Sequence, residues 1–200
     1  MEFVVDEIYV EGCNMLTPSD VIVSSGVKNG DSIFVKSPWN IKKDIEKLQW
    51  VRAVVVDRQL PNKLYIGIKE RKPIAIKQYN KKLQLIDETG QVFNAERISD
   101  FSSLPIFVGS DVEDHVLFVM SYIKKEKRIF SNIDSLQRVG DRRWDVVFKN
   151  KMTVKLPEVN EEEAWERFIA MHNENYVDLA AIKTIDLRVE KKVFIEKRVN

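Results

Sequence analysis

The sequence predicts an α+β fold in two parts: a β-α-α-β-β unit, then a mostly antiparallel β domain with two helices. In the first part, two helix start signals precede a run from Val51 to Ile68 whose side chains alternate with a period of two, the spacing of paired strands. In the second part, short alternating runs between turn residues outnumber the two stretches with helical spacing. Lys72-Pro73 interrupts the pattern, so we place the domains at 1–73 and 74–200.

The first domain opens with a strand predicted at 4–10. Thr17 can cap a helix that follows it, and Pro18 suits the first helical position because its missing N–H would be unpaired there anyway. Ser37-Pro38 repeats this signal for a second helix. Two alternating strand runs then meet at Pro61-Asn62, which supplies a turn. The order strand, helix, helix, strand, strand follows.

The second domain begins with strands on either side of Asn80-Lys81, a predicted turn. A helix is predicted at 111–127, because acids crowd its start and basic residues its end, which matches the helix dipole. Asn160 is the predicted cap of a second helix. The chain then ends in two strands, predicted at 182–189 and 193–197.

Composition excludes several classes of function. Lysine and arginine number 32 against 31 acids, a net charge of +1, without the basic excess of nucleic-acid-binding domains. No apolar run approaches the roughly 18 residues of a membrane span. A single cysteine, Cys13, excludes an intrachain disulfide and a multi-cysteine metal site. Basic clusters such as Lys42-Lys43 are interpreted as solvated faces, with weak attraction to an anionic membrane surface as the alternative.

The residue patterns typical of active sites do not occur. His115 and His172 lie in predicted helices and lack neighbours at metal-ligand spacing. The three consecutive acids at 161–163 point in different directions on a helix, so they cannot converge on one ion. The glycines form neither of the usual phosphate-binding motifs. We therefore predict no enzymatic activity, no metal and no cofactor.

A series of short motifs also runs in a fixed order along the chain. In the first domain they are Leu48, Trp50-Val51, Ala53, Arg58, Pro61, Leu64, Ile66, Glu70, Pro73 and Ala75. In the second they are Leu85-Ile86-Asp87, Gly90, Val92-Phe93, Leu104-Pro105, Gly109, Arg143-Trp144, Leu156-Pro157, Arg167-Phe168 and Ile185-Asp186-Leu187-Arg188. Over nearly the whole chain, this series resembles the POTRA and β domains of the FtsQ/DivIB bacterial cell-division family.

The resemblance implies a scaffold without enzymatic activity. Proteins of this family have a short cytoplasmic tail, one helix across the inner membrane, and the POTRA and β domains outside. They recruit FtsB and FtsL and, through them, the septal peptidoglycan synthesis machinery. The resemblance thus implies that this chain is the periplasmic part, concentrated at the division septum, with its membrane anchor outside these 200 residues.

The resemblance also implies where partners bind. In the family, the last strand of the β domain offers an open edge to an FtsB segment, and here the expected edge spans 184–197. Arg188 matches a family position that can pair with an acid of the partner; the alternative is that it pairs with Asp186 within the sheet. Val189 and Lys191 depart from the residues that the family commonly has there. The partner-binding residues implied are Thr184, Ile185, Asp186, Leu187, Arg188, Val189, Lys191 and Phe194.

Two further residues, Val56 and Arg58, match positions implicated in recruiting the family to the division site, through contacts of the POTRA domain with other divisome proteins. The alternative is a core valine and a solvated arginine. For the whole chain, the second interpretation is a POTRA-containing component of outer-membrane protein assembly or secretion. Tandem POTRA units or a following β-barrel would favour that interpretation, and the sequence contains neither pattern.

Overall fold

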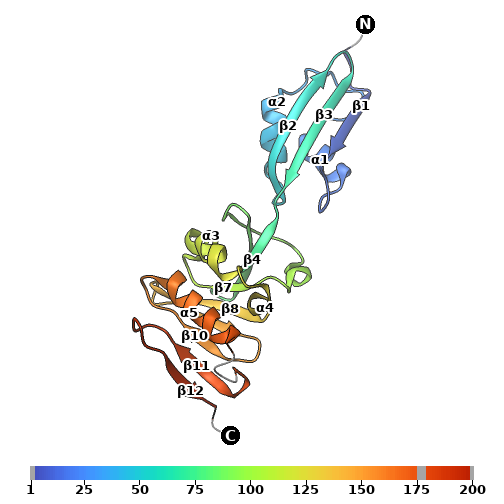
Figure 1. Ribbon diagram of the computed structural model, residues 1–200. Coiled ribbons are helices and arrows are strands. Elements are labelled where there is room, and N and C mark those ends of the chain that lie inside the picture. The colour runs from blue at the N-terminus through green and yellow to red at the C-terminus, as the bar shows by residue number, and fades with distance from the viewer. Residues whose placement is uncertain (1–2, 175–178, 199–200) are drawn as a thin grey trace. The chain divides into compact units, whose positions relative to one another are not determined.

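The chain folds as two units, one ending at Lys72 and one beginning at Pro73 (Figure 1). The structure is a computed structural model that describes residues 3–174 and 179–198. The first unit has the order strand, helix, helix, strand, strand, and the second is built on a mostly antiparallel sheet with helices. The predicted α+β class is confirmed.

In the described part of the first unit, three strands form a sheet in the order β1-β3-β2, with β1 parallel and β2 antiparallel to β3. The two helices cover one face, where Val21, Ile41 and Ile45 pack with Leu64 and Ile66 in a buried core. The elements are β1 (Glu7–Glu11), α1 (Pro18–Ser25), α2 (Pro38–Ile45), β2 (Val51–Gln59) and β3 (Lys63–Glu70).

Both predicted helix starts are confirmed. The Thr17 hydroxyl accepts the Asp20 N–H at 3.2 Å, and the Asp20 carboxylate accepts the Thr17 N–H at 2.8 Å. This reciprocal pair satisfies two donors that a helix start otherwise leaves unpaired. Ser37 caps α2 with its hydroxyl, which accepts the Asn40 N–H at 3.2 Å. Gly26, with φ of 66°, ends α1 in the left-handed conformation that glycine adopts readily.

The described residues of the second unit contribute nine strands to one sheet, in the order β12-β11-β10-β9-β8-β7-β4-β5-β6. Most neighbouring pairs are antiparallel; β4–β7, β7–β8 and β10–β11 are parallel. The strands are β4 (Pro73–Tyr79), β5 (Lys82–Asp87), β6 (Val92–Phe93), β7 (Ile106–Val108), β8 (Ile133–Val139), β9 (Arg143–Phe148), β10 (Thr153–Lys155), β11 (Ile182–Asp186) and β12 (Phe194–Lys197).

The helices of this unit differ from the prediction in detail. The helix predicted at 111–127 ends at Ile123, and residues beyond it form a separate short helix. Asn160 precedes the last helix, but its φ of 62° is not the extended conformation of a capping residue and its side chain makes no capping bond. The helices are η1 (Ile98–Phe101), α3 (Val112–Ile123), α4 (Lys127–Phe130), α5 (Glu161–Asn173) and η2 (Leu179–Ala181).

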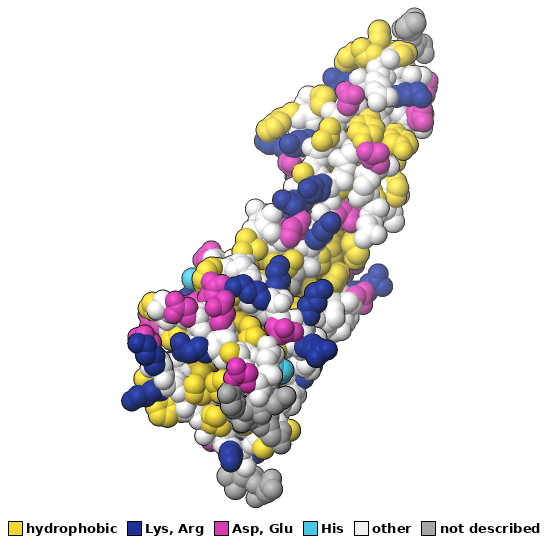
Figure 2. Space-filling view, in the orientation of Figure 1, with side chains coloured by type: hydrophobic (Ala, Val, Ile, Leu, Met, Phe, Trp, Pro, Cys, Tyr) yellow, Lys and Arg dark blue, Asp and Glu magenta, His cyan; other side chains and the backbone are white. Residues whose placement is uncertain are grey.

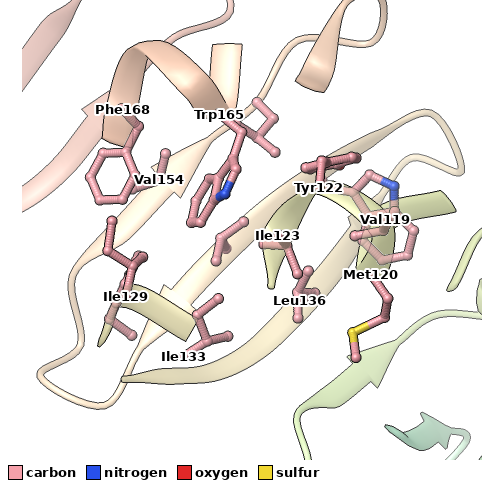
Figure 3. Close-up of a cluster of buried hydrophobic side chains, with 14 of the residues drawn as sticks. Val119, Met120, Tyr122, Ile123, Ile129, Ile133, Leu136, Val154, Trp165 and Phe168 are labelled. Atoms are coloured by element: carbon pink, nitrogen blue, oxygen red, sulfur yellow. The ribbon is translucent and has the colours of Figure 1, made fainter. Parts of the chain in front are cut away.

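A continuous apolar core joins α3 and α5 to the sheet. In Figure 3, Trp165 of α5 lies between Phe168 of the same helix and the α3 residues Ile123 and Tyr122, and Leu136 of β8 lies near Ile123. All five side chains are buried, and the rings of Trp165 and Phe168 are 5.0 Å apart. The core ends before β12, whose four residues are all exposed.

Candidate partner-binding edge

Among the described residues the sheet of the second unit has two outermost strands, β12 and the two-residue β6. The longer one, β12, pairs with β11 alone, in an antiparallel hairpin at one end of the sheet (Figure 1). A strand at an edge leaves backbone N–H and C=O groups available for another strand. The expectation of an edge near the carboxyl end of the sequence therefore fits this strand.

The expected edge at 184–197 is too long, and the structure corrects it. Thr184, Ile185 and Asp186 lie in β11, which pairs with β10 on one side and β12 on the other. The reason is that the chain reverses after Leu187 and adds β12 outside β11. The sequence pattern predicts both strands but not which of them lies outside. The backbone of β11 is therefore used on both sides and cannot receive a partner strand.

The hydrogen bonds of β12 indicate which backbone groups face outward. Arg198 donates its N–H to the Ala181 carbonyl at 2.8 Å, toward the sheet. Because successive residues of a strand direct their backbone groups to opposite sides, Glu196 faces inward as well, and Ile195 and Lys197 face the open side. We infer that these two residues supply the free donors and acceptors of the edge.

Apolar side chains accompany the free backbone. Val189, Val193, Phe194 and Ile195 are all exposed, and we call them the edge strip. Phe194 and Ile195 are consecutive and so point to opposite faces of β12. Because both are exposed, neither face of the strand is covered. An exposed apolar strand is a site at which another chain can pair.

The expected partner residues before the edge strip divide into two groups. The side chains of Ile185 and Leu187 are buried in the core, and the Leu187 N–H donates to the Lys155 carbonyl at 2.9 Å. A partner cannot reach these two side chains, which corrects the prediction for them. Arg188, Val189 and Lys191 are exposed and lie in or next to the turn between β11 and β12.

Arg188 pairs with Asp186. Its Nη2 lies 2.6 Å from the Asp186 carboxylate, and its Nε donates to both carboxylate oxygens at 2.9 and 3.0 Å. These hydrogen bonds hold the pKa of Asp186 below its usual value. The structure thus adopts the alternative in which the two residues pair within the sheet. An acid of a partner would meet a guanidinium that is already oriented by Asp186.

Val56 and Arg58 lie on β2 of the first unit. Val56 is half-buried and packs against the core. Arg58 is also half-buried: its guanidinium lies 5.3 Å from the Phe34 ring centroid and donates to the Lys36 carbonyl. Arg58 is therefore not the solvated arginine of the alternative interpretation, and it ties β2 to the segment before α2.

Across 3–174 and 179–198, no group of three or more His, Cys, Asp and Glu side chains could hold a metal ion. Over the same ranges, no helix is long and apolar enough to cross a bilayer. His115 lies 3.1 Å from the buried Arg138 and 3.3 Å from Asp111, in a polar cluster at the start of α3.

Two residues of the edge strip, Val193 and Ile195, are missing from the partner-binding residues expected from the sequence. The alternation of their side chains predicts a strand, but only the pairing order of the strands reveals that this strand is an edge.

Two family models match the chain. Residues 3–71 match the POTRA domain, FtsQ-type, and residues 75–188 match Cell division protein FtsQ/DivIB, C-terminal. The matched ranges end at residue 188, before the edge strip and before β12. The first unit is thus a POTRA domain of the FtsQ type, as the motif series implies.

Several curated proteins match over nearly the whole length. The cell division protein FtsQ of Rickettsia bellii is 32% identical over 195 residues, which cover 98% of this chain and 73% of that protein. FtsQ of Rickettsia conorii is 31% identical with the same coverage. FtsQ of Rhizobium meliloti is 27% identical, covering 97% of this chain and 63% of that protein.

A solved structure, the major extracytoplasmic domain of the trans isomer of DivIB from Geobacillus stearothermophilus, matches loosely, with a TM-score of 0.35 and 13% identity. The match covers 55% of this chain and 99% of that one. The chain belongs to the FtsQ/DivIB family of bacterial cell-division proteins.

Proposed function

We propose that the chain is a non-enzymatic scaffold of the divisome that binds FtsB, and FtsL with it, by strand addition to β12. In this role it links early and late division proteins during septum formation. The observation that carries the proposal is the open edge of β12, where the backbone groups of Ile195 and Lys197 face outward beside the exposed edge strip. The role in cell division itself follows from family membership.

Strand addition suits this edge physically. A partner segment that pairs with β12 satisfies its free backbone groups, and side chains on alternate positions set the specificity. Phe194 and Ile195 offer apolar contacts on the two faces of the added strand. Arg188 and Lys191, both exposed near the turn, favour an acidic partner segment.

The place of this region in the cell follows from the same proposal. The two units lie on the periplasmic side of the inner membrane at the septum, and a single helix outside this chain anchors the full-length protein. No cofactor takes part, because the proposed binding uses only backbone groups and side chains of the edge.

The POTRA domain would contact other divisome proteins through the β2 surface that bears Val56 and Arg58. Both residues also contribute to the fold of their unit, so an effect of substitution on recruitment must be separated from an effect on stability. The rival role in outer-membrane protein assembly is not favoured, because both domain matches are of the cell-division type.

Site-specific cross-linking tests the proposal. Cys13 is the single cysteine, so a Cys13→Ser background allows one photoreactive label at Ile195→Cys or, as a control, at Leu83→Cys. The two side chains are 41% and 44% exposed, but Leu83 lies on β5, away from the β12 edge. We expect cross-links to FtsB from position 195 alone. Equal cross-linking from both positions, or none from position 195, would contradict strand addition at β12.

A further inference from the structure

One end of the first unit carries large apolar side chains on its surface. Phe3, Phe34, Val35 and Leu60 are exposed there, and we call them the apolar tip. The rings of Phe3 and Phe34 are 5.6 Å apart, and the Ile33 N–H donates to the Phe3 carbonyl at 2.8 Å. In Figure 2, hydrophobic side chains gather at the end of this unit where the described chain begins. The tip thus combines residues from three separate segments.

Lysines accompany the tip. From Ser32 to Lys43 the chain contains three lysines and neither aspartate nor glutamate, although Asp44 pairs with Lys36 and the Glu46 carboxylate lies 3.7 Å from the Lys42 ammonium group. Trp39, 61% exposed, lies in the first turn of α2, after Phe34 and Val35 of the tip and before Lys42 and Lys43 in the sequence. The ammonium groups of Lys42 and Lys43 are 6.0 and 5.6 Å from its ring centroid. Aromatic and basic side chains therefore share one surface.

The fold holds this segment in place. Arg58 stacks on Phe34 and donates to the Lys36 carbonyl, and Ser37 caps the helix that begins directly after it. The exposed Phe34 ring is thus held by its contact with the half-buried Arg58. A shallow hollow beside them is lined by Lys36, Asn40, Lys43, Asp44 and Lys47, three of which are cationic.

We propose that the apolar tip and Trp39 dock on the surface of an anionic lipid bilayer. Tryptophan and phenylalanine suit the boundary between lipid headgroups and acyl chains. Lysines close to such a surface are each attracted by about 1 kcal/mol, which is roughly fivefold in binding. The adjoining hollow is polar, and within it Asp44 pairs with Lys36 and Lys47. The lysines that flank Trp39, Lys42 and Lys43, are therefore the ones assigned to the headgroup phosphates. Docking in this way would fix the orientation of the POTRA domain, independently of the β12 edge.

Vesicle binding of the 200-residue chain tests the proposal. Sedimentation with vesicles of phosphatidylcholine, with and without phosphatidylglycerol, should show binding only when the anionic lipid is present. The double variant Phe34→Ser with Trp39→Ser should bind anionic vesicles about tenfold or more weakly, because it removes two apolar side chains that contact the lipid. Phe118→Ser is the matched control: Phe118 is 54% exposed, as Phe34 is, but lies on α3 of the second unit. Circular dichroism verifies that each variant is folded.

Two further measurements identify the contacts. Lys42→Glu with Lys43→Glu should also remove most binding, and added salt should weaken that of the parent chain. Trp39 fluorescence should shift to the blue on vesicle addition, and Trp39→Phe should abolish this shift, since the other tryptophans are half-buried or buried. Absence of binding to anionic vesicles, equal binding to both lipids, or an equal loss in Phe118→Ser would each overturn the proposal. Capture of FtsB should be unchanged in these variants, so that the two proposals fail separately.

Discussion

Arg188 and Asp186 form a bidentate ion pair where the chain leaves β11. Two guanidinium nitrogens of Arg188 contact the two Asp186 carboxylate oxygens at three distances between 2.6 and 3.0 Å. The Asp186 carboxylate also accepts the backbone N–H of Arg188 at 3.0 Å. The pair therefore fixes the start of the turn that places β12 at the edge. It also orients a guanidinium, a group suited to bidentate recognition of carboxylates, beside the surface that a partner strand would cover.

The first prediction separates these two roles of Arg188. Arg188→Glu should weaken capture of an FtsB segment about tenfold or more, because it removes a charge-assisted contact and sets two carboxylates side by side. The exchange of both residues, Asp186→Arg with Arg188→Asp, restores the internal pair but reverses the charge at position 188. If Arg188 contacts an acid of the partner, as we propose, titration calorimetry should show no recovery in the exchanged variant. Full recovery would mean that the pair only positions the turn.

A second prediction concerns the backbone of the edge. Ile195→Pro removes an outward N–H that β11 does not use, so the sheet should remain folded while FtsB capture falls about tenfold or more. Ile185→Pro is the contrasting variant, because Ile185 lies in β11 between two strands and proline there breaks the sheet. Thermal unfolding should distinguish the two. Normal FtsB binding by a folded Ile195→Pro chain would exclude this edge.

The third prediction is that the two units are separate domains that meet near residue 73. Phe107→Ala removes a buried ring that lies 5.5 Å from Trp144 and should destabilise the second unit by about 3–5 kcal/mol. Ile41→Ala should destabilise the first by about 2–5 kcal/mol. Hydrogen exchange during denaturant unfolding should show each loss confined to its own unit. A loss of stability shared by both units after either substitution would contradict the division.

A fourth prediction concerns acid. Ion pairs with Lys36 and Lys47 lower the pKa of Asp44 to about 2, below the value of about 3.9 in an unfolded chain. Since the folded pKa is the lower one, the pairs stabilise the first unit fully above about pH 4, and this contribution is lost as the pH falls toward about 2. The difference in unfolding free energy between the parent chain and Asp44→Asn should therefore shrink across that interval. A difference that does not change with pH would show that the pairs contribute nothing.

The parts of the fold that depend on local signals could be predicted from sequence. The Thr17 cap, the Ser37-Pro38 helix start and the alternation along β2 and β3 act within a few residues, and they give the order of the first unit. The end of α3 at Ile123 was less predictable, because apolar spacing continues past it while the chain turns into α4.

The candidate site required long-range information. Strands at 182–189 and 193–197 follow from alternation, but alternation does not say that β11 pairs with the distant β10 and leaves β12 outside. For the same reason, Ile185 and Leu187 read as edge residues although they are buried. The contact of Arg58 with Phe34 and Lys36 also joins segments more than 20 residues apart, and no short-range pattern indicates it.

Amide hydrogen exchange at β12 is the most direct test of the account. The N–H groups of Ile195 and Lys197 face the open side, so a synthetic FtsB segment that adds as a strand should protect both from exchange. The N–H of Arg198, already bonded to Ala181, should change much less. Binding of the segment with no gain of protection at Ile195 and Lys197 would contradict the proposal that this scaffold recruits its partner through the edge of its sheet.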